Sequence, residues 1–479
     1  MHAFSGSDGA QPQKALIQAG DGSLYGTTPN GGAHDQGTVF RLDAAGNHTV
    51  LHSFDRCDPA GYRPLGSLIQ ARDGSFYGTT STGGEGNDCT GFVDNRHGAI
   101  FRIDAAGVVS VLHTFYFLAD GQQPYARLVE GSDGSLYGTT RIGGIGDPVK
   151  PSGRGTIYKV DKAGNFTLLH RLSNFDGQHP LTGLVQGTDG FFYGTTNEYQ
   201  TPERSAGGTV FRIDAEGNFT LLHVFGTGRA PRGDLIQARD GLFYGTTESG
   251  GAYNSGTIYR IDAAGNYTLL HDFGFDGGYG TTGGSPVAGL IQASDGSFYG
   301  TAQYGGIPID ADRRGVIYKM DAAGKVGVLH TFYGGADYST PGGTTPMAAL
   351  VETRDGMLYG VALGGPSGSG VVFRYDLHAP AALSRLGVYP TRVIGGDALD
   401  GAPTANVILD APAPPGGAVV KLTSSKPRVA GVPASVTVAE GWATANFTVA
   451  TSDINRDTAV TISATYNGVT KQVTLTVLR

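Results

Sequence analysis

The sequence predicts an all-β protein: a seven-bladed β-propeller closed by its N-terminal strand, followed by a C-terminal immunoglobulin-like β-sandwich. Three observations predict this fold. A unit of 51–60 residues recurs seven times, each unit carries four short strand patterns, and the start of the chain supplies the strand that the last unit lacks. Glycine makes up 79 of the 479 residues without a third-position period. This pattern excludes collagen and fits short strands joined by tight turns.

An Asp-Gly pair in the turn between the first two strands sets the register of the unit. Around it lie an LIQ or LVE strand, an FYGTT strand, a GTVFRID strand and a YTLLHDF strand. These segments are rich in β-branched and aromatic residues and are bounded by Gly, Asp or Asn, as strands are. Four strands per unit at this period are typical of propeller blades. The Asp-Gly pairs begin at Asp21, Asp73, Asp133, Asp189, Asp240, Asp295 and Asp355.

The two ends of the repeat region complement each other. The seventh unit supplies three strands and stops after Asp376, whereas Met1–Phe4 match the end of a fourth strand, with Met1 in the place of leucine. We therefore expect residues 1–4 to complete the last blade and to remove an open sheet edge. Because the chain starts inside a repeat, we interpret Met1 as a processed or truncated start from which any export signal has been removed.

The pattern changes near residue 379. The segment Leu377–Leu383, which contains Pro380, has the composition of a linker, and alternating strand patterns with Pro- and Gly-rich turns follow it. About 100 residues of this kind fit an immunoglobulin-like sandwich. We expect a propeller domain at residues 1–378 and a sandwich domain at residues 379–479.

Loop lengths orient the predicted propeller. The connection between the first and second strands and the connection between the third and fourth strands keep a constant length in every unit. The connection between the second and third strands varies, because the second-strand Tyr and the third-strand aromatic are 14 to 24 residues apart. Alternate turns of an up-and-down sheet emerge on opposite faces, so the variable loops share one face. Binding residues concentrate on loops held by a rigid scaffold. The variable face is therefore the candidate functional surface.

Composition excludes several classes of function. With 34 basic and 42 acidic residues the formal net charge is −8, which does not indicate nucleic acid or an anionic membrane as partner. No apolar run is long enough to span a bilayer. No thiolate zinc site and no phosphate-binding loop ahead of a helix is present. We expect no metal, no cofactor and a monomer whose partner is a glycan or a cell-surface ligand.

The motif YGTTxxGG…GTVF…G…LHxF resembles the GloVer tandem repeat of bacterial extracellular, choice-of-anchor proteins. The resemblance covers residues 1 to about 376, and the last two units depart from it at Thr301-Ala302 and Val361-Ala362. The remaining residues resemble a bacterial immunoglobulin-like module that is common on cell-surface proteins. The resemblance implies this architecture and an extracellular or cell-surface location. It carries over no catalytic residue.

Residues that recur in register are interpreted as structural. They include a fourth-strand His, a second-strand Tyr, a third-strand Arg or Lys two places before an Asp, and Asn-x-Thr triplets that suit turn geometry better than glycosylation. The histidines are His2, His52, His113, His170, His223, His271 and His330. A ring of outer-strand histidines would be too widely spaced to share a metal.

Residues that break the repeat form the candidate site. A His or Tyr base beside an Arg that neutralises a carboxylate is what β-elimination of uronic acids requires. The catalytic candidates, if the protein is an enzyme, are His34, His97, His179, Arg141, Tyr199 and Glu248. The ligand-binding candidates are Arg96, Arg154, Asn197 and Glu198. Cys57 and Cys89 lie in variable loops of adjacent units, and we predict a disulfide between them, which fits an oxidising compartment.

Three functions fit these features, and the third of them is a purely structural role in assembly, which predicts self-association without a glycan ligand. The first is a secreted or cell-surface binding protein whose propeller presents a loop-built face to a glycan or protein. The alternative is a polysaccharide-active enzyme with its site on the same face, a uronic-acid lyase rather than a glycoside hydrolase, which would need two opposed carboxylates. The absence of a recognisable nucleophile motif favours the binding protein.

Overall fold

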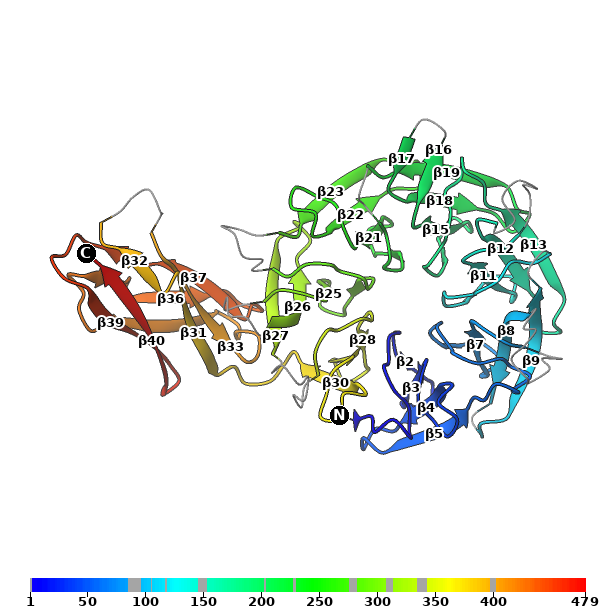
Figure 1. The fold of residues 1–479 in the computed structure, drawn as a ribbon, viewed down its shortest axis with the longest axis horizontal. Helices are drawn as coiled ribbons and strands as arrows, with labels where there is room; N and C mark the ends of the chain where they lie inside the picture. Colours follow the sequence, from blue (N-terminus) through cyan, green and yellow to red (C-terminus); the bar gives the residue numbers. More distant parts are fainter. Residues whose placement is uncertain are drawn as a thin grey trace.

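The structure is a computed structural model that describes residues 2–84, 96–104, 106–116, 119–144, 153–201, 204–226, 230–274, 282–306, 313–333, 343–396 and 402–479. These residues form strands and turns and no α-helix. Seven four-stranded antiparallel sheets follow one another around a ring, and a separate group of sheets lies beside it (Figure 1). Within the described part of the chain, no helix has the length and apolarity that crossing a bilayer requires.

Each ring sheet has its first strand nearest the centre and its fourth strand on the outside (Figure 1). The first strands are β2 (Ile17–Gln18), β6 (Ile69–Gln70), β10 (Val129–Glu130), β14 (Val185–Gln186), β20 (Ile236–Gln237), β24 (Ile291–Gln292) and β28 (Val351–Glu352). The second strands are β3 (Leu24–Thr28), β7 (Phe76–Thr80), β11 (Leu136–Thr140), β15 (Phe192–Thr196), β21 (Phe243–Thr247), β25 (Phe298–Ala302) and β29 (Met357–Ala362). The third strands are β4 (Thr38–Leu42), β8 (Arg96–Ile103), β12 (Thr156–Val160), β18 (Thr209–Ile213), β22 (Thr257–Ile261), β26 (Arg313–Met320) and β30 (Val371–Asp376). The fourth strands are β5 (His48–Ser53), β9 (Val109–Tyr116), β13 (Phe166–Arg171), β19 (Phe219–Val224), β23 (Tyr267–Asp272), β27 (Val326–Tyr333) and, from the start of the chain, β1 (His2–Ala3). A short hairpin, β16 (Tyr199–Thr201) and β17 (Arg204–Ala206), extends the fourth sheet.

The start of the chain belongs to the last ring sheet, as the sequence predicts. Strand β1 pairs antiparallel with β30, with His2 opposite Val372. The Phe4 amide donates to the Gly370 carbonyl at 3.0 Å. The Phe4 side chain is fully buried and packs edge-on against Phe40 of the first sheet, with ring centres 5.2 Å apart. Residues 2–4 therefore join the last sheet to the first.

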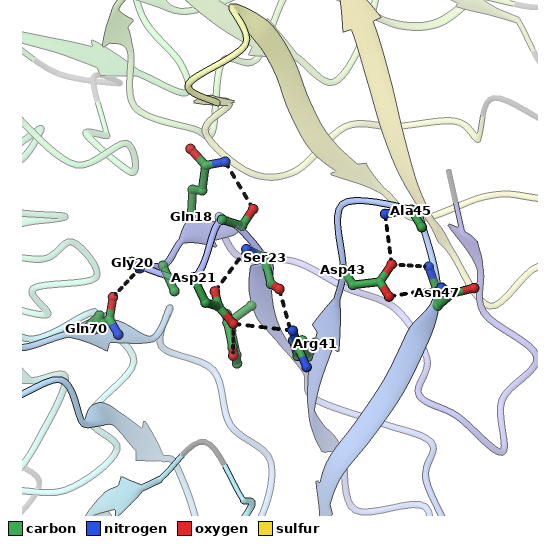
Figure 2. Close-up of polar contacts among 12 residues, drawn as sticks. Gln18, Gly20, Asp21, Ser23, Arg41, Asp43, Ala45, Asn47 and Gln70 are labelled. Carbon is green, nitrogen blue, oxygen red and sulfur yellow. Dashed lines mark hydrogen bonds and ion pairs between the residues drawn. The ribbon is translucent and has the colours of Figure 1, made fainter.

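One hydrogen bond repeats between every pair of neighbouring ring sheets. A backbone amide just after one first strand donates to the Gln or Glu side chain in the first strand of the next sheet, as Gly20 does to Gln70 at 2.8 Å (Figure 2). The last sheet donates to the first in the same way, from Arg354 to Gln18 at 3.0 Å. The other donor–acceptor pairs are Arg72–Glu130, Ser132–Gln186, Thr188–Gln237, Arg239–Gln292 and Ser294–Glu352. The set runs once around the ring without a break.

Aromatic side chains fill the space between sheets. The second-strand Tyr25 stacks on Phe76 of the next sheet at 4.2 Å, and its hydroxyl donates to Asp21 at 3.0 Å. The same stacking recurs for Tyr137, Tyr193 and Tyr244. The sequence interpretation of these tyrosines as inter-sheet core is confirmed. It also explains the Asp of the Asp-Gly turn, which in the first six sheets accepts a hydrogen bond from a tyrosine hydroxyl that would otherwise lack a partner.

The glycine that follows this tyrosine is required by close packing. A Cβ on Gly26 would lie 2.6 Å from the Phe40 ring and 2.7 Å from the Leu16 side chain. Contacts this short are excluded, so a larger residue would push the third-strand aromatic out of place. The YGTT motif is therefore a packing motif.

Among the described residues, no ion pair joins a repeated basic residue to the aspartate two places after it. In the first sheet Arg41 lies 3.4 Å from Asp21 and donates to the Ser23 hydroxyl at 3.0 Å. Asp43 instead accepts from the Ala45 and Asn47 amides and from the Asn47 side chain in the next turn (Figure 2). Asn47 serves turn geometry, as predicted for the Asn-x-Thr triplets.

In the first, third, fourth and fifth sheets the second threonine of YGTT faces a third-strand threonine in a buried hydroxyl pair, whereas in the second sheet Thr80 faces Ala99 and donates to the Ala60 carbonyl. Thr28 and Thr38 lie 2.8 Å apart and are fully buried. The sixth and seventh sheets, which depart from the motif, place Ala302 opposite Val316 and Ala362 opposite Val371. In these two sheets both hydroxyl-bearing residues of the pair are replaced by apolar residues. No buried hydroxyl of the pair is then left without a partner.

This pairing predicts strong non-additivity in the first sheet. Thr28→Ala leaves the Thr38 hydroxyl buried and unpaired, so we expect it to lower the free energy of unfolding by about 1–3 kcal/mol. The double variant Thr28→Ala/Thr38→Val copies the sixth sheet and should recover most of that loss. Urea unfolding of the three proteins measures both values. Additive losses would contradict the pairing.

The residues from Leu383 onward form two further sheets around their own core. One contains β31 (Leu383–Tyr389), β33 (Thr404–Leu409) and β37 (Thr444–Thr448), and the other contains β32 (Arg392–Ile394), β40 (Val469–Leu478), β39 (Thr458–Tyr466), β34 (Ala418–Ser424) and β36 (Ser435–Val438). A two-stranded sheet of β35 (Ala430–Gly431) and β38 (Ala450–Thr451) completes this part. Inward-facing Val420, Ile462 and Leu475 are buried between the sheets.

This C-terminal part packs against the outside of the sixth ring sheet beside β27 (Figure 1). Trp442 covers Gly327, where a Cβ would lie 2.5 Å from the indole ring. The Lys325 ammonium lies 4.9 Å from the same ring, a cation–π contact. Trp442 is therefore part of the contact with the ring.

Candidate functional site

The variable loops of the ring lie on one face, which we call the loop face. In each sheet the connection that leads into the first strand forms a backbone bridge with the segment that follows the second strand. Both connections therefore leave the sheet at the same end. The bridges are Ala10–Asn30, Tyr62–Thr82, Gln122–Ile142, Gln178–Glu198, Pro231–Thr247, Gly284–Tyr304 and Pro346–Ala362.

A cavity of about 350 Å³ opens at the centre of the loop face, and we call it the axial cavity. The residue after the proline that precedes each first strand lines it, so each ring sheet contributes one equivalent side chain. These are Gln13, Leu65, Tyr125, Leu181, Arg232, Val287 and Met347, with Lys14 and Arg141 completing the lining. Equivalent positions from all seven sheets meet only on the axis of the ring.

The backbone before each proline fixes the lining residues in place. In six sheets the residue preceding the proline is not glycine and has a φ between 54° and 58°. This left-handed conformation is uncommon for such residues. It costs about 1–3 kcal/mol and persists only where the surrounding structure enforces it. Here the amide of each such residue binds the preceding sheet, as Gln123 does to the His97 carbonyl at 2.8 Å. The side chain after the proline is thus presented by a rigid turn.

Cations dominate the polar lining of the axial cavity. Arg141 donates to the Gln123 side chain at 3.1 Å, and its guanidinium lies 5.6 Å from the centre of the Tyr125 ring. Arg232 forms an ion pair with Glu248 at 2.7 Å. Lys14 has no ion-pair partner among the described residues. Burial lowers the pKa of Lys14; Asp234 raises it and Arg232 lowers it further.

Behind the lining, Asp234 ties three sheets together. Its carboxylate lies 2.8 Å from Arg127 Nε and accepts from the Gly183 amide at 2.7 Å. The third, fourth and fifth sheets are therefore held together next to the cavity. The carboxylate is already engaged by one guanidinium, which limits the charge it offers to Lys14.

The structure brings two of the predicted catalytic candidates to the axial cavity. Arg141 lines it directly. Glu248 reaches it through the ion pair with Arg232. His97, in strand β8, is linked to Arg141 through Gln123, whose amide binds the His97 carbonyl and whose side chain accepts from Arg141.

Three other candidates gather around His179, the residue before the proline of the fourth sheet. The His179 amide donates to the Arg154 carbonyl at 2.9 Å, and its carbonyl accepts from the Asn197 amide at 3.2 Å. Its ring nitrogen lies 3.5 Å from the Glu198 carboxylate. Arg154 is buried and donates to the Asn174 side chain at 2.6 Å. These contacts indicate a loop-bracing role for the group.

The remaining candidates do not join either group. His34 is exposed in the loop after β3, and Tyr199 begins the hairpin strand β16. Arg96 begins β8, but its side chain lies outside the described residues, as does the whole of Cys89. The Cys57–Cys89 disulfide therefore stays a prediction.

Three residues of the axial cavity were missed by sequence reasoning: Lys14, Tyr125 and Arg232. A signal for Tyr125 and Arg232 existed. When the units are aligned on the proline, the following position changes from polar to aromatic, basic and aliphatic, whereas the leucine three places after it is constant. A position that varies inside a regular repeat is one at which the fold does not require a particular residue, so it marks a candidate binding surface.

The repeated histidines pack between sheets, as predicted. His113 stacks on Phe166 at 4.0 Å and binds Asp120 at 3.0 Å. Where the last and first sheets meet, the aromatic partner is itself a histidine, and His2 stacks on His48 at 4.0 Å.

His2, Asp8 and His48 carry possible metal-ligand atoms that lie within 4.8 Å of one another. The two rings are nearly parallel, at 4°. Their lone pairs lie in separate planes and do not converge on one point. Burial beside His2 lowers the pKa of His48 to about 4, against a smaller opposing effect of Asp8. The cluster is a packed contact between the first and last sheets.

Solved structures with a similar arrangement share little sequence with this chain. A putative 6-phosphogluconolactonase from Bacteroides uniformis is 17% identical over 74% of this chain and 92% of its own, with a TM-score of 0.46. Puromycin hydrolase is 14% identical over 85% of this chain and 60% of its own, with a TM-score of 0.48. A protein of unknown function from Dyadobacter fermentans is 11% identical over 64% and 91%, with a TM-score of 0.40. Likeness at this level bears on neither substrate nor activity.

The sequence itself matches a repeat family. Among curated proteins, none matches the chain. The model of the Gloeobacter/Verrucomicrobia repeat matches three overlapping stretches, residues 1–147, 90–282 and 227–389. Together these stretches span all seven ring sheets and most of the chain. The chain therefore belongs to the Gloeobacter/Verrucomicrobia repeat family.

Proposed function

We propose that residues 1–378 form a closed seven-bladed β-propeller and that residues 379–479 form an immunoglobulin-like sandwich. The unbroken set of amide-to-side-chain hydrogen bonds supports closure, because the bond from Arg354 to Gln18 repeats the bond from Gly20 to Gln70. The C-terminal residues form two mainly antiparallel sheets around a common core, and this arrangement supports the assignment of an immunoglobulin-like sandwich.

The proposed function is that of a secreted or cell-surface binding protein that presents the loop face to a glycan or protein ligand. One observation carries this proposal. The axial cavity is lined by one equivalent position from every ring sheet, and the chemistry of that position varies from sheet to sheet. A uniform scaffold with a varied central lining is the arrangement that binding proteins use to present a specific site.

Exposed aromatic side chains on the loop face add support. Phe175, Tyr253 and Tyr304 lie in the variable connections of the third, fifth and sixth sheets and are more than half exposed. Exposed aromatic residues mark interaction surfaces when they gather on one face of a soluble domain. Rings of this kind suit the apolar faces of sugars.

The C-terminal part leaves the loop face open. It packs on the outside of β27 and does not lie over the centre of the ring (Figure 1). The ring thus has one side fixed by the sandwich and an axial cavity that remains accessible. This placement supports a role for the sandwich as a spacer or attachment module at the cell surface.

A plug variant tests the binding proposal. We expect the purified protein to be retained on at least one class of ligand in a panel of immobilised glycans and cell-envelope proteins. Val287→Trp fills the axial cavity and should abolish retention, whereas Val419→Trp, on an exposed strand of the C-terminal part, should not. Failure of the wild-type protein to bind any member, or equal binding by the plug variant, would contradict the proposal.

A second candidate function, a uronic-acid lyase, is favoured by one contact. Arg141 lies over the ring of Tyr125 inside the axial cavity, which places a carboxylate-neutralising group beside a phenol that could serve as base. Ultraviolet absorbance of unsaturated uronate products, measured across acidic polysaccharides, tests it. Turnover that Arg141→Ala abolishes would replace the binding proposal with the lyase.

A further inference from the structure

Three cations from alternate ring sheets meet in the axial cavity. Lys14 comes from the first sheet, Arg141 from the third and Arg232 from the fifth. The other sheets contribute apolar side chains to the lining: Leu65, Leu181, Val287 and Met347. A single group that reaches all three cations must lie on the ring axis.

Lys14 is the most informative of the three. It has no ion-pair partner among the described residues, and burial is the main cause of its lowered pKa, which the charge of Asp234 raises and the charge of Arg232 lowers. Holding like charges together in a partly buried space is unfavourable. A bound anion would relieve this repulsion and would restore the pKa of Lys14 toward its ordinary value.

The neighbouring carboxylates do not neutralise the cavity. Glu248 is paired with Arg232 and Asp234 with Arg127. Among the residues that the structure describes, neither Lys14 nor Arg141 forms an ion pair with a carboxylate, although the charge of Asp234 still favours the protonated form of Lys14. Arg141 itself contacts a neutral amide and an aromatic ring. Guanidinium and ammonium groups without a carboxylate partner are the groups that proteins use to bind oxyanions.

The remaining lining suits a sugar residue that carries such an oxyanion. A volume of about 350 Å³ is at the lower end of the range of small-molecule sites, roughly 300–1,000 Å³. Tyr125 offers an aromatic wall, Gln13 an amide, and the aliphatic side chains an apolar rim. One terminal sugar with a charged substituent matches these features.

We propose that the axial cavity binds an oxyanion on the terminal sugar of an acidic glycan, with Lys14 and Arg141 as the groups that hold it. This inference rests on the proposed binding function and names its ligand class. Uronic acids and sulfated sugars share the oxyanion, and the experiment separates them.

Calorimetric titration with four probes tests the inference: trigalacturonate, a sulfated maltotriose, neutral maltotriose and inorganic sulfate. We expect one of the two charged trisaccharides to bind, more tightly than maltotriose and than sulfate alone. Lys14→Gln and Arg141→Gln should each weaken that binding about tenfold or more, because each removes a charged hydrogen-bond donor. Lys421→Gln, an equal change of charge on an exposed strand of the C-terminal part, should leave it unchanged.

Which trisaccharide binds identifies the source of the oxyanion. Equal affinity for maltotriose, indifference to both charge variants, or no binding of any probe overturns the inference. None of these results contradicts the proposed binding function if the wild-type protein is still retained on a member of the glycan and protein panel and Val287→Trp abolishes that retention. Loss of that retention is the separate result that overturns the function.

Discussion

Phe4→Ala is expected to lower the free energy of unfolding by about 3–5 kcal/mol, the usual cost of removing a buried phenylalanine. Phe4 lies four residues from the start of the chain, where side chains are ordinarily loose. Here it is fully buried in a cluster that joins Leu16 and Phe40 of the first sheet to Val361 and Val372 of the last. Its loss opens a void between the first and last sheets. Chemical unfolding followed by tyrosine fluorescence measures the change.

Phe54→Ala provides the matched control. Phe54 holds the same place in the first unit, is equally buried, and packs against Phe101 at 5.5 Å. Phe54 lies between two sheets that follow each other in the chain. The loss in the free energy of unfolding caused by Phe54→Ala therefore gives the value expected at a position that does not depend on ring closure. Similar losses for both variants support closure by the N-terminal residues. A loss at Phe54 with almost none at Phe4 would mean that the start of the chain is not packed into the ring.

Acid is expected to destabilise the protein between about pH 6.5 and pH 4. Burial lowers the pKa of both His48 and His330 to about 4, whereas an unfolded histidine titrates near 6.5. In this interval the unfolded chain binds protons that the folded chain does not, so stability falls as the pH falls. With allowance for solvent screening, each histidine accounts for roughly 1–2 kcal/mol. Urea midpoints measured at several pH values give the profile.

His48→Phe isolates the contribution of the contact between the first and last sheets. The third sheet carries Phe166 at the equivalent place, where it stacks on His113, so phenylalanine fits this environment. We expect the variant to match or exceed the wild type in stability at neutral pH and to lose less on acidification. An acid profile identical to that of the wild type would show that His48 does not carry the effect.

The regular part of this fold was predictable from the sequence because each unit repeats the same local chemistry. The Asp-Gly turns, the strands around Tyr25 and the pairing of residues 2–4 with the last unit follow from register and strand pattern, and the structure has them. The departure at Ala302 and Ala362 was visible, but its reason was not. Their partners Val316 and Val371 lie on another strand.

The candidate site was predictable only in part. Arg141 was found because it breaks the repeat in a variable loop, whereas Lys14 and Arg232 sit in otherwise regular segments. Their importance comes from convergence on the axis, which depends on how the sheets are arranged around the ring. In the same way, the repeat marked Arg41 as a structural residue but did not reveal its partner, Asp21, which lies in the turn before the second strand.

The account depends on the ring being joined through its N-terminal residues, and amide hydrogen exchange tests this most directly. The Phe4 amide donates to Gly370, just as the Phe54 amide donates to Gly37 and the Phe225 amide to Gly208, each at 2.9–3.0 Å. We predict protection of Phe4 comparable to that of Phe54 and Phe225. Exchange of Phe4 at the rate of an unstructured peptide, with Phe54 and Phe225 still protected, would contradict the joined ring and the axial cavity built on it.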